Sequence, residues 1–91
     1  MPLQLSMESA ETLGLDALAW LAGEPEALEK FLKLSGISGA DLRAAAGSSA
    51  LSVAVLDFLL SHEDFLLAFC ESHAIRAALL HQARHVLAPE T

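Results

Sequence analysis

The sequence predicts an all-α fold, a compact orthogonal bundle of five or six short helices around a central apolar helix at about residues 50–60. The first observation behind this prediction is that residues 51–60 carry only two polar side chains, Ser52 and Asp57. Wound as a helix, this run is apolar nearly all round, so other helices must cover it on several sides. The second observation is that alanine and leucine, both strong helix formers, supply much of the 54% hydrophobic content. The third is that the turns are short, as in bundles of antiparallel helices.

The first helix is expected at residues 7–22, after a short flexible N-terminal tail at residues 1–6. Ser6 is a favourable N-cap residue, and Gly23 is the residue type that most often follows the last turn of a helix. A single helical domain is then expected to cover residues 7–88, since neither a linker nor an internal repeat interrupts it.

The second and third helices are predicted from residues that begin and end helices. Proline suits the first helical position, so Glu24-Pro25 begins the second helix, which ends before Gly36. Ser38 caps a short third helix, and Asp41 lies three residues later, where the acidic partner of a capping box belongs. We expect this short third helix, which glycines flank, to be the most mobile segment.

The remaining helices are separated by serine-containing turns. The Gly47-Ser48-Ser49 loop ends the third helix and caps the central one. Ser61, with Asp64 three residues later, is expected to cap a fifth helix in the same way. The sixth helix is expected at residues 74–88, because Pro89 cannot continue it.

Composition argues against several classes of function. The formal net charge is −7, with 12 acidic and 5 basic residues, whereas binding to a nucleic-acid backbone relies on clustered lysine and arginine. The apolar runs are far shorter than the roughly 20 residues that cross a bilayer, so we expect no membrane segment. Residues 1–6 contain no basic residue, which argues against a signal peptide. The single cysteine suits a reducing compartment, and the cytoplasm is the expected location.

The charge is unevenly distributed along the chain. Residues 1–29 contain six acidic residues and no basic one, whereas residues 72–91 contain two arginines and three of the four histidines. One interpretation is that the two ends of the chain lie near each other in the fold. The other is that the acidic half forms a polar docking surface that orients a partner.

Four segments, in this order and spacing, resemble a known family. They are Ala17-Leu18-Ala19-Trp20-Leu21-Ala22, Asp41-Leu42-Arg43, Val55-Leu56-Asp57-Phe58-Leu59-Leu60 and Leu67-Ala68-Phe69-Cys70. The family is one of small bacterial proteins, mostly from alphaproteobacteria, and is catalogued as domain of unknown function number thirty-five seventy-two. The resemblance covers about residues 8–87 and implies a small helical cytoplasmic protein with no assigned activity. It brings no catalytic residue, and the histidines at 73, 81 and 85 are not part of the pattern.

The sharpest chemical candidate is a zinc site. Cys70-x-x-His73 and His81-x-x-x-His85 place four nitrogen and sulfur ligands at helical spacings, and a structural zinc takes four such ligands. Against this, Cys70 lies beside Phe69 on an apolar stripe, where a free cysteine behaves as a small hydrophobic residue. We therefore expect solvated surface histidines, and the sequence implies no metal and no cofactor.

Asp57 is the second candidate, because a charge in the central helix needs a partner if it is buried. Arg43, in the preceding helix, is the expected partner in a structural ion pair that holds the third helix to the fourth. The alternative is that Asp57 faces water beside Ser61.

The functional hypothesis follows mainly from the classes of function that the sequence argues against. A cysteine–histidine pair lacks an oxyanion hole or a third orienting group, so we do not expect an enzyme. The leading hypothesis is a non-catalytic protein-interaction module, an adaptor or regulator, in which exposed apolar residues contact an unidentified partner. The residues expected on that surface are Leu15 and Leu80, with Val53 and Leu60 as further candidates. A self-associating structural homodimer is the alternative, and a metal-dependent or cysteine-dependent activity at Cys70, His73, His81 and His85 is the remote one.

Overall fold

The computed structural model describes residues 5–89 and confirms the all-α prediction. Residues 1–4, most of the expected N-terminal tail, lie outside the described residues, as do residues 90–91. Within the described part, the chain forms six helices and no strand. These are α1 (Met7–Ala22), α2 (Pro25–Ser35), α3 (Gly39–Ala44), α4 (Ser49–Ser61), α5 (Glu63–His73) and α6 (Ala77–Leu87).

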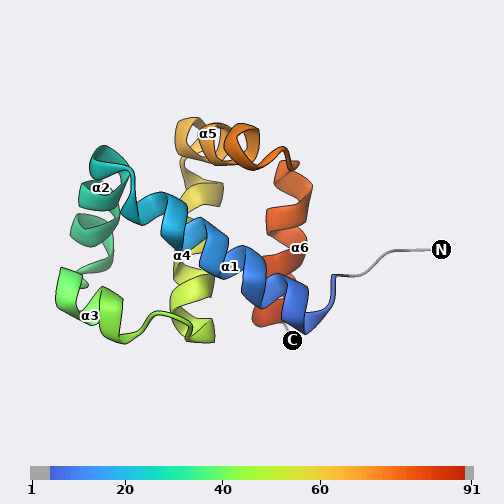
Figure 1. The fold of residues 1–91 in the computed structure, drawn as a ribbon, viewed down its shortest axis with the longest axis horizontal. Coiled ribbons are helices and arrows are strands. Elements are labelled where there is room, and N and C mark those ends of the chain that lie inside the picture. The colour runs from blue at the N-terminus through green and yellow to red at the C-terminus, as the bar shows by residue number, and fades with distance from the viewer. Residues whose placement is uncertain (1–4, 90–91) are drawn as a thin grey trace.

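Three helices form the centre of the bundle. The most extensive contacts are those between α1 and α6, between α1 and α4, and between α4 and α6. Figure 1 shows α1 crossing in front of α4, with α6 on one side and α2 and α3 on the other. Helix α5 lies across the top of the view, near the ends of α4 and α6 (Figure 1). The central position predicted for the apolar helix is therefore shared by α1, α4 and α6.

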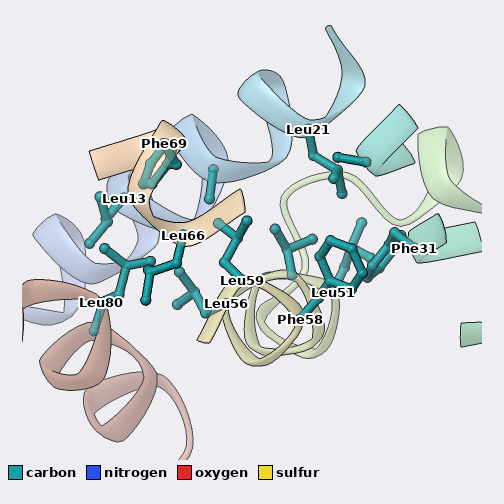
Figure 2. Packing of buried hydrophobic residues seen from close by; sticks show 14 of the residues in the cluster. Leu13, Leu21, Phe31, Leu51, Leu56, Phe58, Leu59, Leu66, Phe69 and Leu80 are labelled. Atoms are coloured by element: carbon teal, nitrogen blue, oxygen red, sulfur yellow. The ribbon is translucent and has the colours of Figure 1, made fainter. Parts of the chain in front are cut away.

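The apolar run at residues 51–60 lies in α4 and is covered on several sides, as the sequence predicted. Helix α4 buries Leu51, Ser52, Val55, Leu56, Phe58 and Leu59. In Figure 2, Phe58 points toward Phe31 of α2, whereas Leu59 and Leu56 point toward the side of the core that contains Leu66 and Phe69 of α5. Because α4 serves both sides, all the buried hydrophobic residues join in one cluster.

The crossing of α1 over α4 depends on a glycine. A Cβ atom added at Gly14 would lie 2.6 Å from the Oγ atom and 2.7 Å from the Cβ atom of Ser52. Contacts this short are repulsive, so a residue without a side chain is needed at this position for the two helices to approach each other.

Three serines cap helices as predicted. The Oγ atom of Ser6 accepts a hydrogen bond from the Ser9 backbone N–H at 3.0 Å, which caps α1. Ser38 caps α3 through Asp41, and Ser48 caps α4 through Leu51. The serine caps expected for the first, third and fourth helices are thus confirmed.

The expected cap at Ser61 is wrong, because α4 continues through this residue. His62 is the N-cap of α5, since its carbonyl accepts the first helical hydrogen bond from Leu66, and its side chain makes no capping bond. The acidic Glu63 and Asp64 lie in the first turn instead, where carboxylates stabilise the positive end of the helix.

The expected start of the sixth helix is also wrong, by three residues. Ala74 has a φ of 53° and ends α5 in the left-handed region, so the chain turns before α6 begins at Ala77. The Ile75 N–H donates to the Cys70 carbonyl at 3.0 Å, the long-range bond of a Schellman motif. Glycine usually marks this turn, and alanine gave no signal of it.

Candidate functional site

Leu15 lies on the outer face of α1 and is 46% exposed, as the sequence predicted. Three other large apolar side chains are more than half exposed among the described residues. They are Met7, Leu34 and Leu67. A single exposed leucine has no special meaning, so the surroundings of each residue decide whether it belongs to a contact surface.

Leu15 borders an apolar groove of about 290 Å³ between α1 and α3, here named the Leu15 groove. The residues that line it are Leu15, Leu18, Ala19, Ala22, Leu42, Arg43 and Ala46. The three alanines leave space between the larger leucines, which is why the surface is hollowed. Arg43 is the only polar residue of the lining, so a ligand here would be held mainly by apolar contact with one cation at its side.

Arg43 therefore lies at the Leu15 groove, and the expected ion pair between Arg43 and Asp57 is wrong. Asp57 pairs with Arg84 of α6: its Oδ1 accepts from Nε at 2.8 Å, and its Oδ2 accepts from Nη2 at 3.4 Å. The Arg84 Nη1 also donates to the Ala88 carbonyl at 2.9 Å, near the end of α6. The physical reason is the packing of α6 along α4, which brings a residue 27 positions away to Asp57.

Leu80 is fully buried, so the expectation that it forms a contact surface is wrong. Helix α6 turns Leu80 and Ala83 toward the core, where Leu80 lies in the same cluster as Leu66 (Figure 2). The apolar residues of α6 outnumber those that one face can bury, and the sequence pattern alone favoured a neighbouring face. Val53 and Leu60 are half-buried and contribute little exposed surface.

The four proposed zinc ligands are not brought together. Cys70 is buried in the core, whereas His73, His81 and His85 are exposed. The His73 ring packs on Phe69, with ring centroids 4.4 Å apart. Residues 5–89 contain no group of three or more histidine, cysteine, aspartate or glutamate side chains that could hold a metal ion. Burial raises the pKa of the Cys70 thiol, because the charged thiolate is poorly solvated there.

A second groove, of about 370 Å³, lies between α2 and α4 and contains an aspartate, a serine and a histidine: Asp57, Ser61 and His62. These are the residue types of a hydrolytic triad, but two of them are engaged elsewhere. The Asp57 carboxylate is held by Arg84. The Nδ1 atom of His62 lies 2.7 Å from the Phe58 carbonyl, which can only accept, so Nδ1 carries the proton of that bond. No hydrogen bond among the described residues joins the three side chains.

A third groove, of about 310 Å³, lies between α1 and α6 and is here named the acidic groove. Its apolar residues are Leu5, Leu13, Ile75 and Leu79, and its polar ones are Glu8, Ser9, Thr12 and Asp16. Sequence reasoning noted the acidic first helix but missed this groove. The apolar residues opposite the carboxylates are Ile75, in the turn before α6, and Leu79, in α6. They lie more than fifty positions away in the sequence, and only the fold shows that they lie together.

Comparison with known proteins identifies the family and leaves the activity open. None of the helices within residues 5–89 combines the length and the apolar character that crossing a bilayer requires. No curated protein and no solved structure was found to match the chain. The model of one protein family matches residues 7–90, nearly the whole chain and almost the same range as the resemblance seen in the sequence. The chain therefore belongs to the family described as protein of unknown function (DUF3572).

Proposed function

We propose that this protein is a non-catalytic protein–protein interaction module, an adaptor or regulator in the cytoplasm, and that the Leu15 groove holds an apolar segment of its partner. The observation that carries the proposal is the groove itself, in which exposed Leu15 borders a hollow lined almost entirely by apolar side chains. A helix with apolar residues at i, i+3 or i+4, and i+7 is the usual occupant of such a groove.

The groove combines two properties that favour binding. Partner atoms that cover Leu15 and its apolar neighbours remove apolar surface from water, which contributes about 25 cal/mol per Å². The small side chains of Ala19, Ala22 and Ala46 allow larger side chains of the partner to enter between the two helices. Arg43, at the side of the groove, gives the partner an orientation, because a carboxylate placed there is favoured over a cation.

Self-association through the same groove is the alternative function, and the charges argue against it. In a two-fold dimer each copy presents the same patch to the other. Glu11, one turn before Leu15, and Asp16, directly after it, are both exposed, so such a dimer would bring like charges together. Each copy also has a formal net charge of −7. A different, less acidic protein is therefore the favoured partner.

A cysteine-dependent activity is disfavoured by the surroundings of Cys70. Nucleophilic cysteines act as thiolates and lie in exposed, electropositive sites. Cys70 is buried, and burial raises the pKa of its thiol, which keeps the sulfur protonated. A free, buried cysteine also suits a reducing compartment such as the cytoplasm.

The test is affinity capture from a lysate of the host organism with the wild-type chain and two matched variants. Leu15→Gln removes the apolar border of the groove. Leu67→Gln makes the same change at a leucine of α5 that is 58% exposed, somewhat more than Leu15. We expect one partner, recovered in near-equal amount with the wild type and with Leu67→Gln, to be lost with Leu15→Gln.

Two outcomes would contradict the proposal. One is equal recovery of the same partner with both variants. The other is recovery of the protein alone together with a mass that doubles with concentration in light scattering, which would establish the homodimer. Circular dichroism of each variant separates lost binding from lost folding.

A further inference from the structure

We propose that the acidic groove between α1 and α6 binds a basic amphipathic helix of the protein partner, with two lysine or arginine residues two turns apart and an apolar residue between them. This inference rests on the proposed interaction function and adds the chemistry and the spacing of the partner segment. It concerns a different surface from the Leu15 groove, on the other flank of α1.

The shape of the acidic groove supports an apolar contact at its centre. Leu13 is buried at its base, and Leu5, Ile75 and Leu79 are half-buried around it. Thr12 lies between the two carboxylates along α1, but its hydroxyl donates to the Glu8 carbonyl at 3.0 Å. Because that hydroxyl is engaged within α1, the middle of the groove presents mainly apolar atoms to a ligand.

The two carboxylates fix the positions of the cations. Glu8 and Asp16 are exposed and lie at opposite ends of the α1 side of the groove. Among residues 5–89, neither of them forms an ion pair, since the one salt bridge there joins Asp57 to Arg84. Eight residues of α-helix rise about 12 Å, which is too far for one side-chain cation to contact both carboxylates closely. Two cations are therefore needed.

The same distance sets the spacing in the partner. A helix that lies along α1 matches a separation of about 12 Å with basic residues at i and i+7 or i+8. A residue at i+3 or i+4 then lies between them, over Leu13, Ile75 and Leu79. Arg76 lines a neighbouring depression that shares Ile75 and Leu79 with the acidic groove. Its charge disfavours cations on the α6 side and so keeps them over α1.

The charge of the surrounding surface favours the same occupant. Helix α1 carries three exposed acidic residues, Glu8, Glu11 and Asp16, and no basic one. A field of one sign attracts an oppositely charged segment and raises the rate of association, and salt weakens this effect. The same field repels a second copy of this chain. The occupant is therefore a basic segment of another protein.

The experiment measures binding of synthetic helical peptides to the full 91-residue chain labelled with ¹⁵N. The probe peptide carries arginine at i and i+7 and leucine at i+3 and i+4. A matched peptide carries citrulline, which has nearly the same shape without the charge, at both arginine positions. A spacing control exchanges the second arginine with the leucine at i+4, so that its composition is unchanged. Amide chemical shifts report the place of binding, and titration reports Kd.

We expect the probe peptide to shift the amides of Thr12, Leu13, Ile75 and Leu79. The Glu8→Gln/Asp16→Asn double variant should weaken binding roughly tenfold, since each exposed ion pair contributes a few-fold in affinity. The Glu26→Gln/Glu29→Gln double variant removes two exposed carboxylates from α2 and should leave Kd unchanged. The citrulline peptide should bind about as weakly as the probe peptide does to the first double variant. The spacing control keeps one cation over one carboxylate and should be weakened only a few-fold.

Equal weakening by both double variants would overturn the inference, because attraction to any acidic surface would explain it. Equal binding of the arginine and citrulline peptides would overturn it as well. If the probe peptide does not bind the acidic groove but capture of a partner still depends on Leu15, this inference is wrong and the proposed function stands. If the wild-type chain captures no partner, the proposed function itself falls.

Discussion

At the scale of single residues, the pair formed by Asp57 and Arg84 joins α4 to α6 at the edge of the core. Both oxygens of the carboxylate accept from the guanidinium, and the side chains are 48% and 29% exposed. This partial exposure matters, because water and salt screen the attraction, and exposed ion pairs contribute only about 0.2–1 kcal/mol. The pair therefore contributes only modestly to the packing of α4 on α6 and is not a main source of stability.

Replacing Asp57 with asparagine should lower the free energy of unfolding by about 0.5–1 kcal/mol, because the attraction between the Asp57 carboxylate and Arg84 is lost. Urea unfolding in low and high salt measures this loss, which should shrink as salt screens the wild-type pair. Arg43→Met is the matched control, and we expect it to leave stability unchanged. A destabilisation by Arg43→Met as large as that by Asp57→Asn would contradict the pairing in the structure.

The difference between the expected partner of Asp57, Arg43, and the observed one, Arg84, shows what the sequence can and cannot predict about Asp57. That Asp57 would need a cation if it were buried follows from its place in an apolar run. Which cation it meets depends on the helix that packs beside α4, and that is decided by the burial of many side chains together. Arg43 is nearer in the sequence, but α6 brings Arg84 across 27 positions.

Ala74→Gly should stabilise the protein by about 1 kcal/mol. Ala74 has a φ of 53°, a left-handed conformation that costs residues with a Cβ atom roughly 1–2 kcal/mol, and glycine loses part of this gain through its greater freedom in the unfolded chain. Thermal unfolding should show a rise of about 4–8 °C per kcal/mol.

Ala68→Gly provides the comparison for that change. Ala68 is exposed in the middle of α5, where glycine costs about 1 kcal/mol relative to alanine. The two substitutions, one within α5 and one at its C-cap, should therefore shift the melting temperature in opposite directions. A lower melting temperature for both Ala74→Gly and Ala68→Gly would show that the backbone at Ala74 is not strained.

At the scale of elements, α1 and α4 approach each other closely where they cross at Gly14 and Ser52. Gly14→Ala should destabilise the protein by roughly 1–3 kcal/mol, because the added Cβ atom would lie 2.7 Å or less from two Ser52 atoms and the helices must move apart. Chemical denaturation measures the change.

Gly39→Ala is the control for helix propensity. Gly39 begins α3, and nothing lies within 4 Å of the position that its Cβ atom would occupy. Alanine there should be neutral or stabilising by up to about 1 kcal/mol. If Gly14→Ala behaved in the same way, the close packing of α1 on α4 would be wrong.

Helix ends differ in how well the sequence predicts them. The ends at Ser6, Ser38 and Ser48 were predictable, because a serine side chain satisfies a backbone N–H only a few residues away. The boundary between α5 and α6 was not, because Ala74 adopts a left-handed conformation that its residue type disfavours and that only the folded chain shows. Local chemistry predicts an end, and packing can override it.

At the scale of the whole molecule, some helices are buried much more extensively than others. The Leu15 groove lies beside one of the least buried helices, α3. Helices α1, α4 and α6 make the most extensive contacts. Helix α3 has six residues and buries only Leu42. One wall of the groove therefore belongs to the stable centre and the other to a weakly held element. The sequence favoured a mobile third helix, but it could not show that this helix borders the exposed face of α1.

Native-state hydrogen exchange should reveal this difference. Amides of α4 and of the buried faces of α1 and α6 should exchange only through global unfolding, because opening them exposes the shared core. Amides of α3 should exchange through local opening at much lower free energy, since losing α3 exposes little more than Leu42. A partner that occupies the Leu15 groove should slow exchange in α3 most, because binding removes the local opening. Equal protection of α3 and α4 in the free protein would contradict a weakly held wall, and the groove would then be a rigid surface that its partner must fit.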